Sequence, residues 1–195
     1  MIKRVFSLFR TLLYYKLVFK EIGIRSVILS PLKLEHPQNI KIGNHVYIAY
    51  KSWLAAAPQL TNSKSELIIN DGCRIGNFNH IYATTSIILE KNVLTADKVY
   101  ISDNLHQYEN IHLPIWKQPI KQLAKVIIGE GAWIGENVCI IGASVGKNSV
   151  IGANSTVTKD IPAYCVAVGS PAKVIKRFCV ESQTWKKTDQ YGKII

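Results

Sequence analysis

The feature that most constrains this chain is the recurrence of one aliphatic residue every six positions. In the second half of the chain the spacing is carried by Ile128, Ile134, Ile140 and then, after a slip of one residue, by Val145, Ile151, Val157. Upstream it is carried by Ile42, Ile48 and by Ile69, Ile75, Ile81, Ile87, Val93, Val99, and a glycine directly follows several of these residues. Neither an α-helix nor an ordinary strand gives a period of six. A chain that coils with short flat faces does, because each face sends one aliphatic side chain inward to stack on the next coil. The spacing therefore predicts a β-solenoid of hexapeptide repeats.

The rhythm has two irregular places. Between Ile81 and Ile101 a second series (Leu89, Thr95, Ile101) competes with Ile87, Val93, Val99, and spacing alone leaves the register open. From residue 100 to 119 the rhythm stops, and the segment "YISDNLHQYENIHLPIWKQP" is polar, aromatic and interrupted by prolines.

The formal net charge of +11 is concentrated near both ends of the chain. Residues 1–33 hold seven basic side chains and a single acid, Glu21, and the chain from Lys159 onward is also rich in lysine. Such clusters indicate an anionic partner or a solvated basic face. No basic-aromatic surface motif accompanies the charge, so we do not expect nucleic-acid binding. The four cysteines are widely spaced without a CxxC pair, which favours reduced thiols and a cytoplasmic protein.

The N-terminal segment "MIKRVFSLFRTLLYYKLVFKE" predicts a basic amphipathic helix that ends near Gly23. Its longest uncharged run, Thr11 to Tyr15, is too short for a signal-peptide core or a membrane span. Residues 1–22 could pack on their own domain or a neighbouring subunit, or lie on the inner face of an anionic membrane.

The segment "GAWIGENVCIIGASVGKNSVIGANSTVTKDIPAYCVAVGSPAKVIKRF" resembles the C-terminal half of hexapeptide-repeat acetyltransferases. The similarity is greatest to capsule and polysaccharide O-acetyltransferases, which are related to the maltose and galactoside acetyltransferases. The segments "PQNIKIGNHVYIA", "ELIINDGCRIGNFNHI" and "VYISDNLHQY" match the same family in order, so the resemblance runs from about Leu34 to Phe178.

This resemblance implies an all-β fold, a left-handed parallel β-helix that assembles as a homotrimer and takes acetyl-CoA as acyl donor, with no metal required. It divides the chain into a basic helical segment (1–33), the β-helix domain (34–178) and a short C-terminal tail (179–195). Residues 102–124 resemble the loop that the family ejects from one coil, and their polarity and prolines fit a segment outside the stack.

Acetyl transfer to a sugar hydroxyl needs a base, because the hydroxyl is a poor nucleophile at neutral pH. Among the five histidines, His106 aligns with the histidine that acts as base in the related sugar acetyltransferases. Asp103 could orient its ring, as the third group of a triad does, or could simply form a turn at the loop entrance. Asn79 matches an acceptor-binding position and His80 is its neighbour, although an asparagine ladder inside the solenoid explains Asn79 equally well.

For acetyl-CoA, the resemblance points to six residues: Trp133, Ala153, Thr158, Lys159, Lys173 and Lys176. The two last lysines could meet the phosphates of the cofactor, as point charges rather than as bidentate donors. Alternatively, these two lysines belong to a solvated basic tail and do not contact the cofactor.

The favoured function is thus O-acetylation of a polysaccharide or of its precursor. The alternative within this class is N-acetylation of a nucleotide-linked amino sugar. Two more distant alternatives share the solenoid: a metalloenzyme of the γ-carbonic anhydrase type, for which His80, His106 and His112 would be candidate ligands, and a non-catalytic trimeric scaffold.

Overall fold

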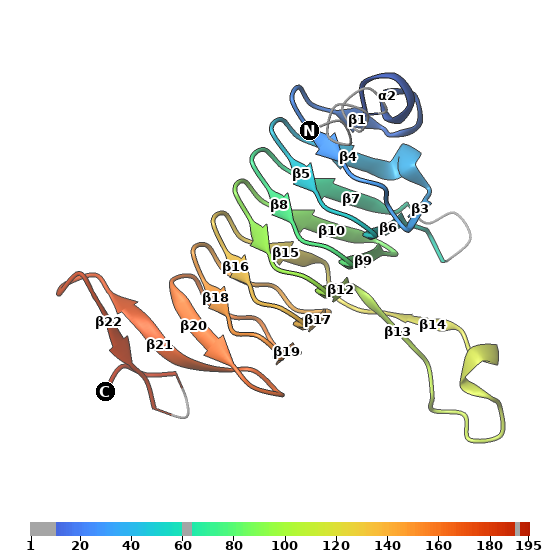
Figure 1. Ribbon diagram of the computed structural model, residues 1–195. Coiled ribbons are helices and arrows are strands. Elements are labelled where there is room, and N and C mark those ends of the chain that lie inside the picture. Colours follow the sequence, from blue (N-terminus) through green and yellow to red (C-terminus); the bar gives the residue numbers. More distant parts are fainter. Residues whose placement is uncertain (1–10, 60–63, 190–191) are drawn as a thin grey trace.

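The chain winds into a stack of coils whose strands form three parallel sheets, the sides of a triangular prism (Figure 1). A computed structural model describes residues 11–59, 64–189 and 192–195. Sheet A contains β1 (Glu21–Ile22), β4 (Ile40–Ile42), β7 (Glu66–Ile69), β10 (Ser86–Leu89) and β15 (Val126–Ile128). Sheet B contains β2 (Val27–Ile28), β5 (Tyr47–Ile48), β8 (Arg74–Ile75), β11 (Leu94–Thr95), β16 (Trp133–Ile134), β18 (Val150–Ile151) and β20 (Cys165–Val168). Sheet C contains β3 (Lys33–Glu35), β6 (Trp53–Ala56), β9 (His80–Ala83), β12 (Tyr100–Ser102), β17 (Cys139–Ile141) and β19 (Thr156–Val157). Each coil runs from A to B to C, and we call the bends between them the A/B, B/C and C/A corners.

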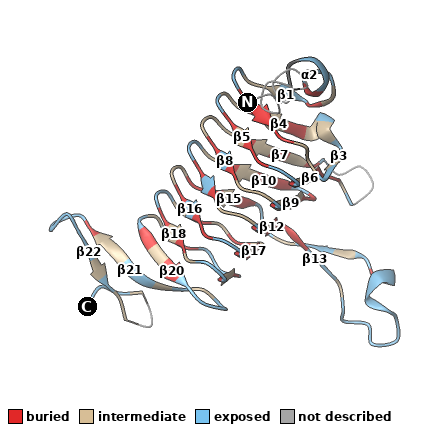
Figure 2. Cartoon of the chain, viewed as in Figure 1, coloured by how far each residue is buried: buried red, intermediate tan, exposed pale blue. Residues whose placement is uncertain are grey.

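The core is one column of aliphatic side chains inside the prism, visible as the buried positions along most strands of the coils (Figure 2). In sheet A, Ile69 pairs with Leu89, which pairs with Ile128, and all three are fully buried. Burying a side chain of this size stabilises a fold by about 1.5–3 kcal/mol. Repetition of such stacks along the axis stabilises strands that are only two to four residues long.

The register between Ile81 and Ile101 follows from the side-chain alternation of a strand. Ile87 and Leu89 both point inward from β10, because residues two apart in a strand share one face. The two competing series are therefore both part of the core. Leu89 pairs with Ile69 twenty positions earlier, so this coil is two residues longer than three hexads, and the extra length lies at the C/A corner around Thr84.

The slip of one residue after Ile140 shortens the following C/A corner. Val145 forms a bridge with Ile128, seventeen positions earlier, and the regular pairing then continues. Gly142 turns this corner with a φ of 58°, a left-handed conformation that favours glycine. A Cβ at this position would lie 2.6 Å from the Leu123 side chain, so the short corner needs glycine for space as well.

The N-terminal end of the solenoid begins earlier than the predicted boundary after residue 33. Helical residues end at Val18, in the short segments η1 (Thr11–Tyr15) and α2 (Lys16–Val18), instead of near Gly23. β1 then already pairs with β4. Ile22, Ile28 and Leu34 continue the six-residue spacing, and this signal places the first coil inside the predicted helical segment. Tyr15 and Phe19 are buried against the core and cover this end, while residues 1–10 lie outside the described part of the chain.

At the other end, the chain turns back on sheet B. β21 (Lys173–Cys179) runs antiparallel to β20, and β22 (Thr184–Lys187) runs antiparallel to β21. Part of the predicted tail 179–195 is therefore a strand of the largest sheet. The four cysteines are all unpaired thiols. None of the helices within the described residues is long and apolar enough to cross a membrane.

Candidate active site

An arm of two antiparallel strands leaves the prism at a C/A corner, inside the segment 102–124 (Figure 1). Its strands are β13 (Asn104–His106) and β14 (Ile120–Gln122), and a turn of 3₁₀ helix, η3 (Ile115–Lys117), lies near the tip. The arm has its own bonds: the Gln118 amide donates to the carbonyls of Asn110 and Leu113, and Lys121 forms an ion pair with Glu109 at 3.0 Å. It is an ordered extension rather than a loose loop.

His106 stands on the first strand of this arm. Its backbone pairs with Ile120 across the arm, and its side chain is exposed. The imidazole is therefore held on a defined strand and remains accessible, as a base that must reach a bound hydroxyl requires.

Asp103 anchors the arm to the prism through its carboxylate, which is fully buried. Its Oδ1 accepts bonds from the backbone N–H and the hydroxyl of Thr84, both at 2.8 Å. Its Oδ2 accepts the backbone N–H groups of Thr85 at 2.8 Å and Ser86 at 2.9 Å. Three successive N–H groups thus converge on one carboxylate, an arrangement that fixes its position by several hydrogen bonds at once.

The second strand of the arm is tied to the same corner through Gln122. Its amide nitrogen donates to the Asp103 carbonyl at 2.7 Å, and its Oε1 lies 2.7 Å from the Thr84 hydroxyl, whose single proton is shared between Gln122 and Asp103. We call Thr84, Asp103 and Gln122 the arm clamp. Both oxygens of this carboxylate are engaged by the preceding coil, which supports an anchoring role for Asp103, while orientation of the His106 ring by Asp103 stays a prediction. Gln122 was not anticipated from the sequence, because its partner Thr84 lies 38 positions away.

Asn79 lies inside the solenoid at a B/C corner, and its burial does not support the predicted role in acceptor binding. It is fully buried, donates to the carbonyls of Asn77 and Ala96, and accepts from the Thr95 hydroxyl at 2.8 Å. These bonds tie one coil to the next. Asn79 is therefore a structural ladder residue that no acceptor can reach.

His80 belongs to an aromatic column on the outer face of sheet C. It stacks on Trp53 with ring centroids 4.1 Å apart, and Tyr82 and Tyr100 pack against its edges. Burial lowers the pKa of His80 because it disfavours the charged imidazolium; nearby Glu35 opposes this effect and Lys33 adds to it. Its Nε2 is buried and has no hydrogen-bond partner among the described residues. The ring thus packs against the outer face of sheet C, where burial favours its neutral form.

Four of the six predicted cofactor residues gather on sheet B and the corner beside it. Trp133 pairs with Val150, Val150 with Val166, and Val166 with Lys176, so Trp133 and Lys176 belong to one column of sheet B. Both side chains are exposed. Ala153 follows β18 at the B/C corner, and Lys173 begins β21 at the same edge.

The other two cofactor residues lie elsewhere. Thr158 and Lys159 follow β19 at the C/A corner, the corner from which the arm also leaves, two coils earlier. The predicted residues therefore occupy two edges of the prism, with sheet C between them. One edge carries His106 with Thr158 and Lys159, and the other carries Ala153 and Lys173.

The histidines considered as metal ligands are also separated in the fold. His80 lies on sheet C, whereas His106 and His112 lie on the arm. In the part of the chain that the structure describes, no three His, Cys, Asp or Glu side chains converge on a common point.

Comparison with known proteins gives matches over most of the chain. The family profile described as "Hexapeptide repeat of succinyl-transferase" matches residues 125–159. Galactoside O-acetyltransferase of Escherichia coli (strain K12) is 31% identical over 163 residues, which are 83% of this chain and 65% of the relative. WbbJ of the same organism, provisionally named a lipopolysaccharide-biosynthesis O-acetyl transferase, is 32% identical over 129 residues, which are 62% of this chain and 65% of the relative. The chain thus spans somewhat less than two thirds of the length of either relative.

Solved structures share the fold at lower identity. A variant of the N-acyltransferase AntD from Bacillus cereus, in complex with dTDP-4-amino-4,6-dideoxyglucose and coenzyme A, superposes with a TM-score of 0.71 at 20% identity, covering 86% of this chain and 88% of that one. The hexapeptide-repeat acetyltransferase VCA0836 from Vibrio cholerae gives a TM-score of 0.60 at 21% identity, covering 88% and 80%. The expected left-handed parallel β-helix is confirmed. By its repeats and its fold the chain is a hexapeptide-repeat β-helix, and its sequence is similar over most of its length to acetyltransferases built from such repeats.

Proposed function

We propose that this protein is an acetyl-CoA-dependent O-acetyltransferase that acts on a sugar hydroxyl of a polysaccharide or of its precursor. The observation that carries the proposal is the exposure of His106 on an arm that is tied to the prism. The resemblance to sugar acetyltransferases assigns the role of base to this position. The names of the relatives, which include a galactoside O-acetyltransferase, support a sugar acceptor.

The proposed transfer is direct. The Nε2 or Nδ1 of His106 accepts the proton of the sugar hydroxyl while the hydroxyl oxygen attacks the thioester carbonyl carbon. A C–O bond forms between them as the π electrons of the carbonyl move onto the carbonyl oxygen. The tetrahedral intermediate collapses by breaking its C–S bond, and the imidazolium returns the proton to the departing thiolate of coenzyme A.

Acetyl-CoA binding is assigned to the residues on and beside sheet B. Trp133 offers an exposed apolar surface to the pantetheine arm, and Lys173 and Lys176 offer charge to its phosphates. Lys159 and Thr158 extend this set to the edge that carries the arm.

The test is release of free thiol from acetyl-CoA by the pure protein, with simple sugars, nucleotide-linked amino sugars and bacterial oligosaccharides as acceptors. His106→Ala should lose about 10²–10⁴ in turnover while its fold is kept. His112→Ala is the matched control, because His112 is the other exposed histidine of the same arm. Near-normal turnover of the His106 variant would refute the assignment.

The second candidate is N-acetylation of a nucleotide-linked amino sugar. It is favoured by the likeness to AntD, which binds such a sugar together with coenzyme A. The acceptor panel separates the two, because only N-transfer requires an amino group on the acceptor.

We further propose that the active unit is a homotrimer in which the arm of one copy packs on a neighbour. The arm exposes several large apolar side chains: Tyr108, Ile111, Leu113, Ile115 and Trp116. Ile111 is 87% exposed and Trp116 is 75% exposed. Exposing neighbouring apolar side chains of this size to water is unfavourable and unusual in a free monomer. Mass measurement in solution should give three copies, and Ile111→Ser with Trp116→Ser should lower the association.

For residues 1–22 we propose peripheral contact with the inner face of the membrane of a cytoplasmic protein. Within the described part of this segment, Leu17 is 84% exposed one helical turn after the exposed Leu13, with Lys16 beside them. Sedimentation with vesicles that contain anionic lipid, compared with neutral vesicles, tests this proposal.

A further inference from the structure

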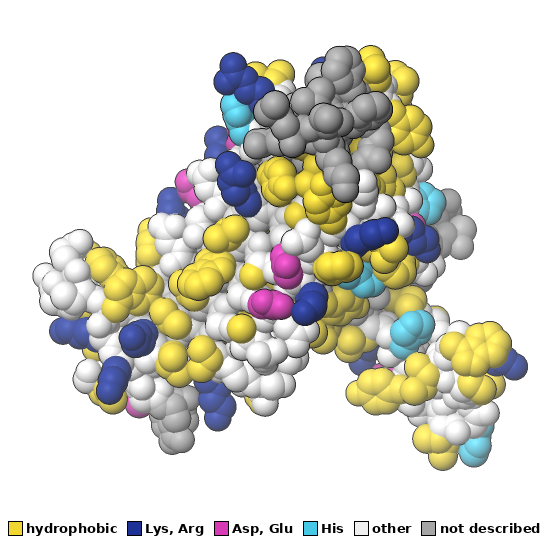
Figure 3. Space-filling model, in the orientation of Figure 1, with side chains coloured by type: hydrophobic (Ala, Val, Ile, Leu, Met, Phe, Trp, Pro, Cys, Tyr) yellow, Lys and Arg dark blue, Asp and Glu magenta, His cyan; other side chains and the backbone are white. Residues whose placement is uncertain are grey.

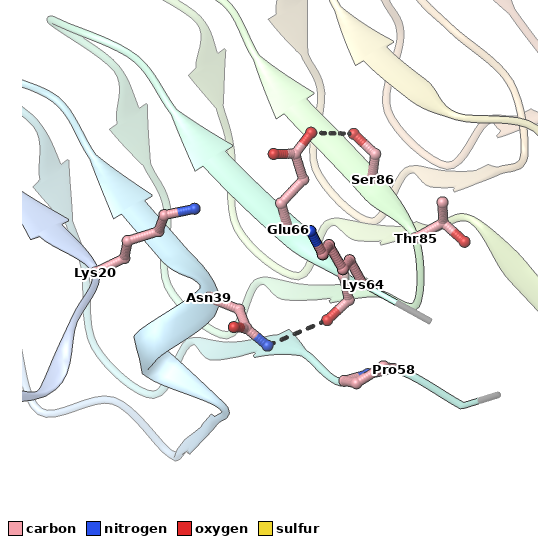
Figure 4. A pocket seen from close by; sticks show the side chains of 8 residues that line it. Lys20, Asn39, Pro58, Lys64, Glu66, Thr85 and Ser86 are labelled. Carbon is pink, nitrogen blue, oxygen red and sulfur yellow. Dashed lines mark hydrogen bonds between the residues drawn. The ribbon is translucent and has the colours of Figure 1, made fainter. Parts of the chain in front are cut away.

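A polar hollow of about 640 Å³ lies along the C/A edge, on the N-terminal side of the arm (Figure 4). It is lined by Lys20, Asn39, Pro58, Lys64, Ser65, Glu66, Thr85 and Ser86. These residues come from the start of the first coil, from η2 (Pro37–Asn39), and from the corners before β7 and β10. None of them belongs to the predicted acetyl-CoA set.

The floor of the hollow is held in place by its own hydrogen bonds. The Asn39 amide donates to the Ala56 carbonyl and to the Ser65 hydroxyl. The Ser86 hydroxyl donates to Glu66 at 3.0 Å, across the paired strands β7 and β10. Amide, hydroxyl and carboxylate groups in fixed positions are the groups that recognise sugar hydroxyls by hydrogen bonding.

Two lysines give this hollow its charge. Five other lysines of the described residues are ion-paired: Lys33, Lys41, Lys98, Lys121 and Lys147. No ion pair joins Lys20 or Lys64 to any described residue, and both side chains enter the hollow (Figure 4). Against them stands one carboxylate, Glu66, so the hollow carries an excess of positive charge.

The hollow is also connected to the arm. Thr85 and Ser86 line it, and their backbone N–H groups are those that hold Asp103 at the base of the arm. A molecule bound in the hollow therefore contacts the same corner that fixes Asp103. His106 follows Asp103 by three residues on the arm.

From these observations we infer that the hollow is an acceptor subsite for an acidic sugar residue, whose carboxylate is bound by Lys20 and Lys64 while its hydroxyls bond to Asn39 and Glu66. The inference rests on the proposed saccharide acceptor and narrows it to an anionic saccharide. Since inorganic phosphate offers charge but is too small to reach Asn39 and Glu66 with a separate set of hydroxyls, the oligosaccharide rather than inorganic phosphate is the expected ligand.

Calorimetric titration without acetyl-CoA tests the subsite independently of catalysis. The probes are a hyaluronan tetrasaccharide, which carries glucuronate, fully N-acetylated chitotetraose, which is neutral and of equal length, and inorganic phosphate. The hyaluronan fragment should bind more tightly than both others. Lys20→Ser with Lys64→Ser should weaken its binding on the order of tenfold, whereas Glu66→Gln should leave the lysines unopposed and tighten it.

The matched control is Lys91→Ser with Lys98→Ser, which removes the same charge elsewhere on the prism. The inference is overturned if chitotetraose binds as tightly as the hyaluronan fragment, if neither binds, or if both double variants weaken binding equally. If the hyaluronan fragment binds as expected but no acceptor stimulates thiol release from acetyl-CoA, the subsite is supported and the proposed acetyl transfer is refuted.

Discussion

Replacing Asp103 by asparagine tests whether this residue fixes the arm or serves the chemistry. Asparagine keeps the shape and one acceptor oxygen, so the two bonds from Thr84 can remain. The amide nitrogen would then face the N–H groups of Thr85 and Ser86, which now donate to Oδ2. Two donors lose a charged acceptor, and each unsatisfied buried donor costs about 1–3 kcal/mol. Because the Thr85 side chain is exposed and water can reach its vicinity, we expect a loss of about 2–4 kcal/mol in the free energy of unfolding.

The assay is urea unfolding followed by circular dichroism, at one fixed protein concentration because assembly contributes to stability. Asp71→Asn is the matched control: its carboxylate holds one backbone N–H, that of Asn44, at another corner of the prism. This variant should lose about 1 kcal/mol. An unchanged unfolding midpoint for Asp103→Asn, together with a collapse of turnover, would refute the clamp and return Asp103 to the chemistry.

Three further predictions follow from other parts of the molecule. Ile140→Ala should lower the free energy of unfolding by about 2–5 kcal/mol, since Ile140 is fully buried between Ile101 and Val157, and calorimetry would measure the loss. Because the pKa of His80 is lowered in the fold, the unfolded chain takes up its proton first as the pH falls below about 6.5, and stability should drop there; His80→Phe should remove this part of the pH dependence of the urea midpoint. Lys173→Ala with Lys176→Ala should weaken acetyl-CoA binding at low salt and have a smaller effect as the ionic strength rises, and an effect independent of salt would count against a phosphate contact.

The solenoid could be predicted from the sequence because its main signal is local. One inward residue per face repeats every six positions, and the spacing is visible even where a coil is shortened at Gly142 or lengthened near Thr84. The open register near Leu89 came from expecting one inward residue per face where the strands place two.

The site was harder to predict because its residues act through distant partners. Asn79 and Asp103 both look like polar residues of a binding site, and both are satisfied by neighbouring coils: Thr95 for the first, Thr84 to Ser86 for the second. A single sequence shows the residue types but not which coil corner will lie beside them. The exposed position of His106 agrees with the sequence argument, since an arm outside the stack has no coil to bury it.

The two ends of the prism bear on how copies of the chain can meet, because its side carries apolar and basic side chains interspersed on the face that Figure 3 shows. A parallel strand at the end of a solenoid offers a row of unpaired backbone groups, on which a second copy could continue the sheet and start a fibre. At one end the turn-back of β21 and β22 occupies the edge of sheet B, and at the other Tyr15 and Phe19 close over the first coil. Growth along the axis is thereby discouraged, and copies are left to associate through their sides. Sideways contact between identical prisms can close on itself after a few members, so capped ends are consistent with the finite assembly proposed above.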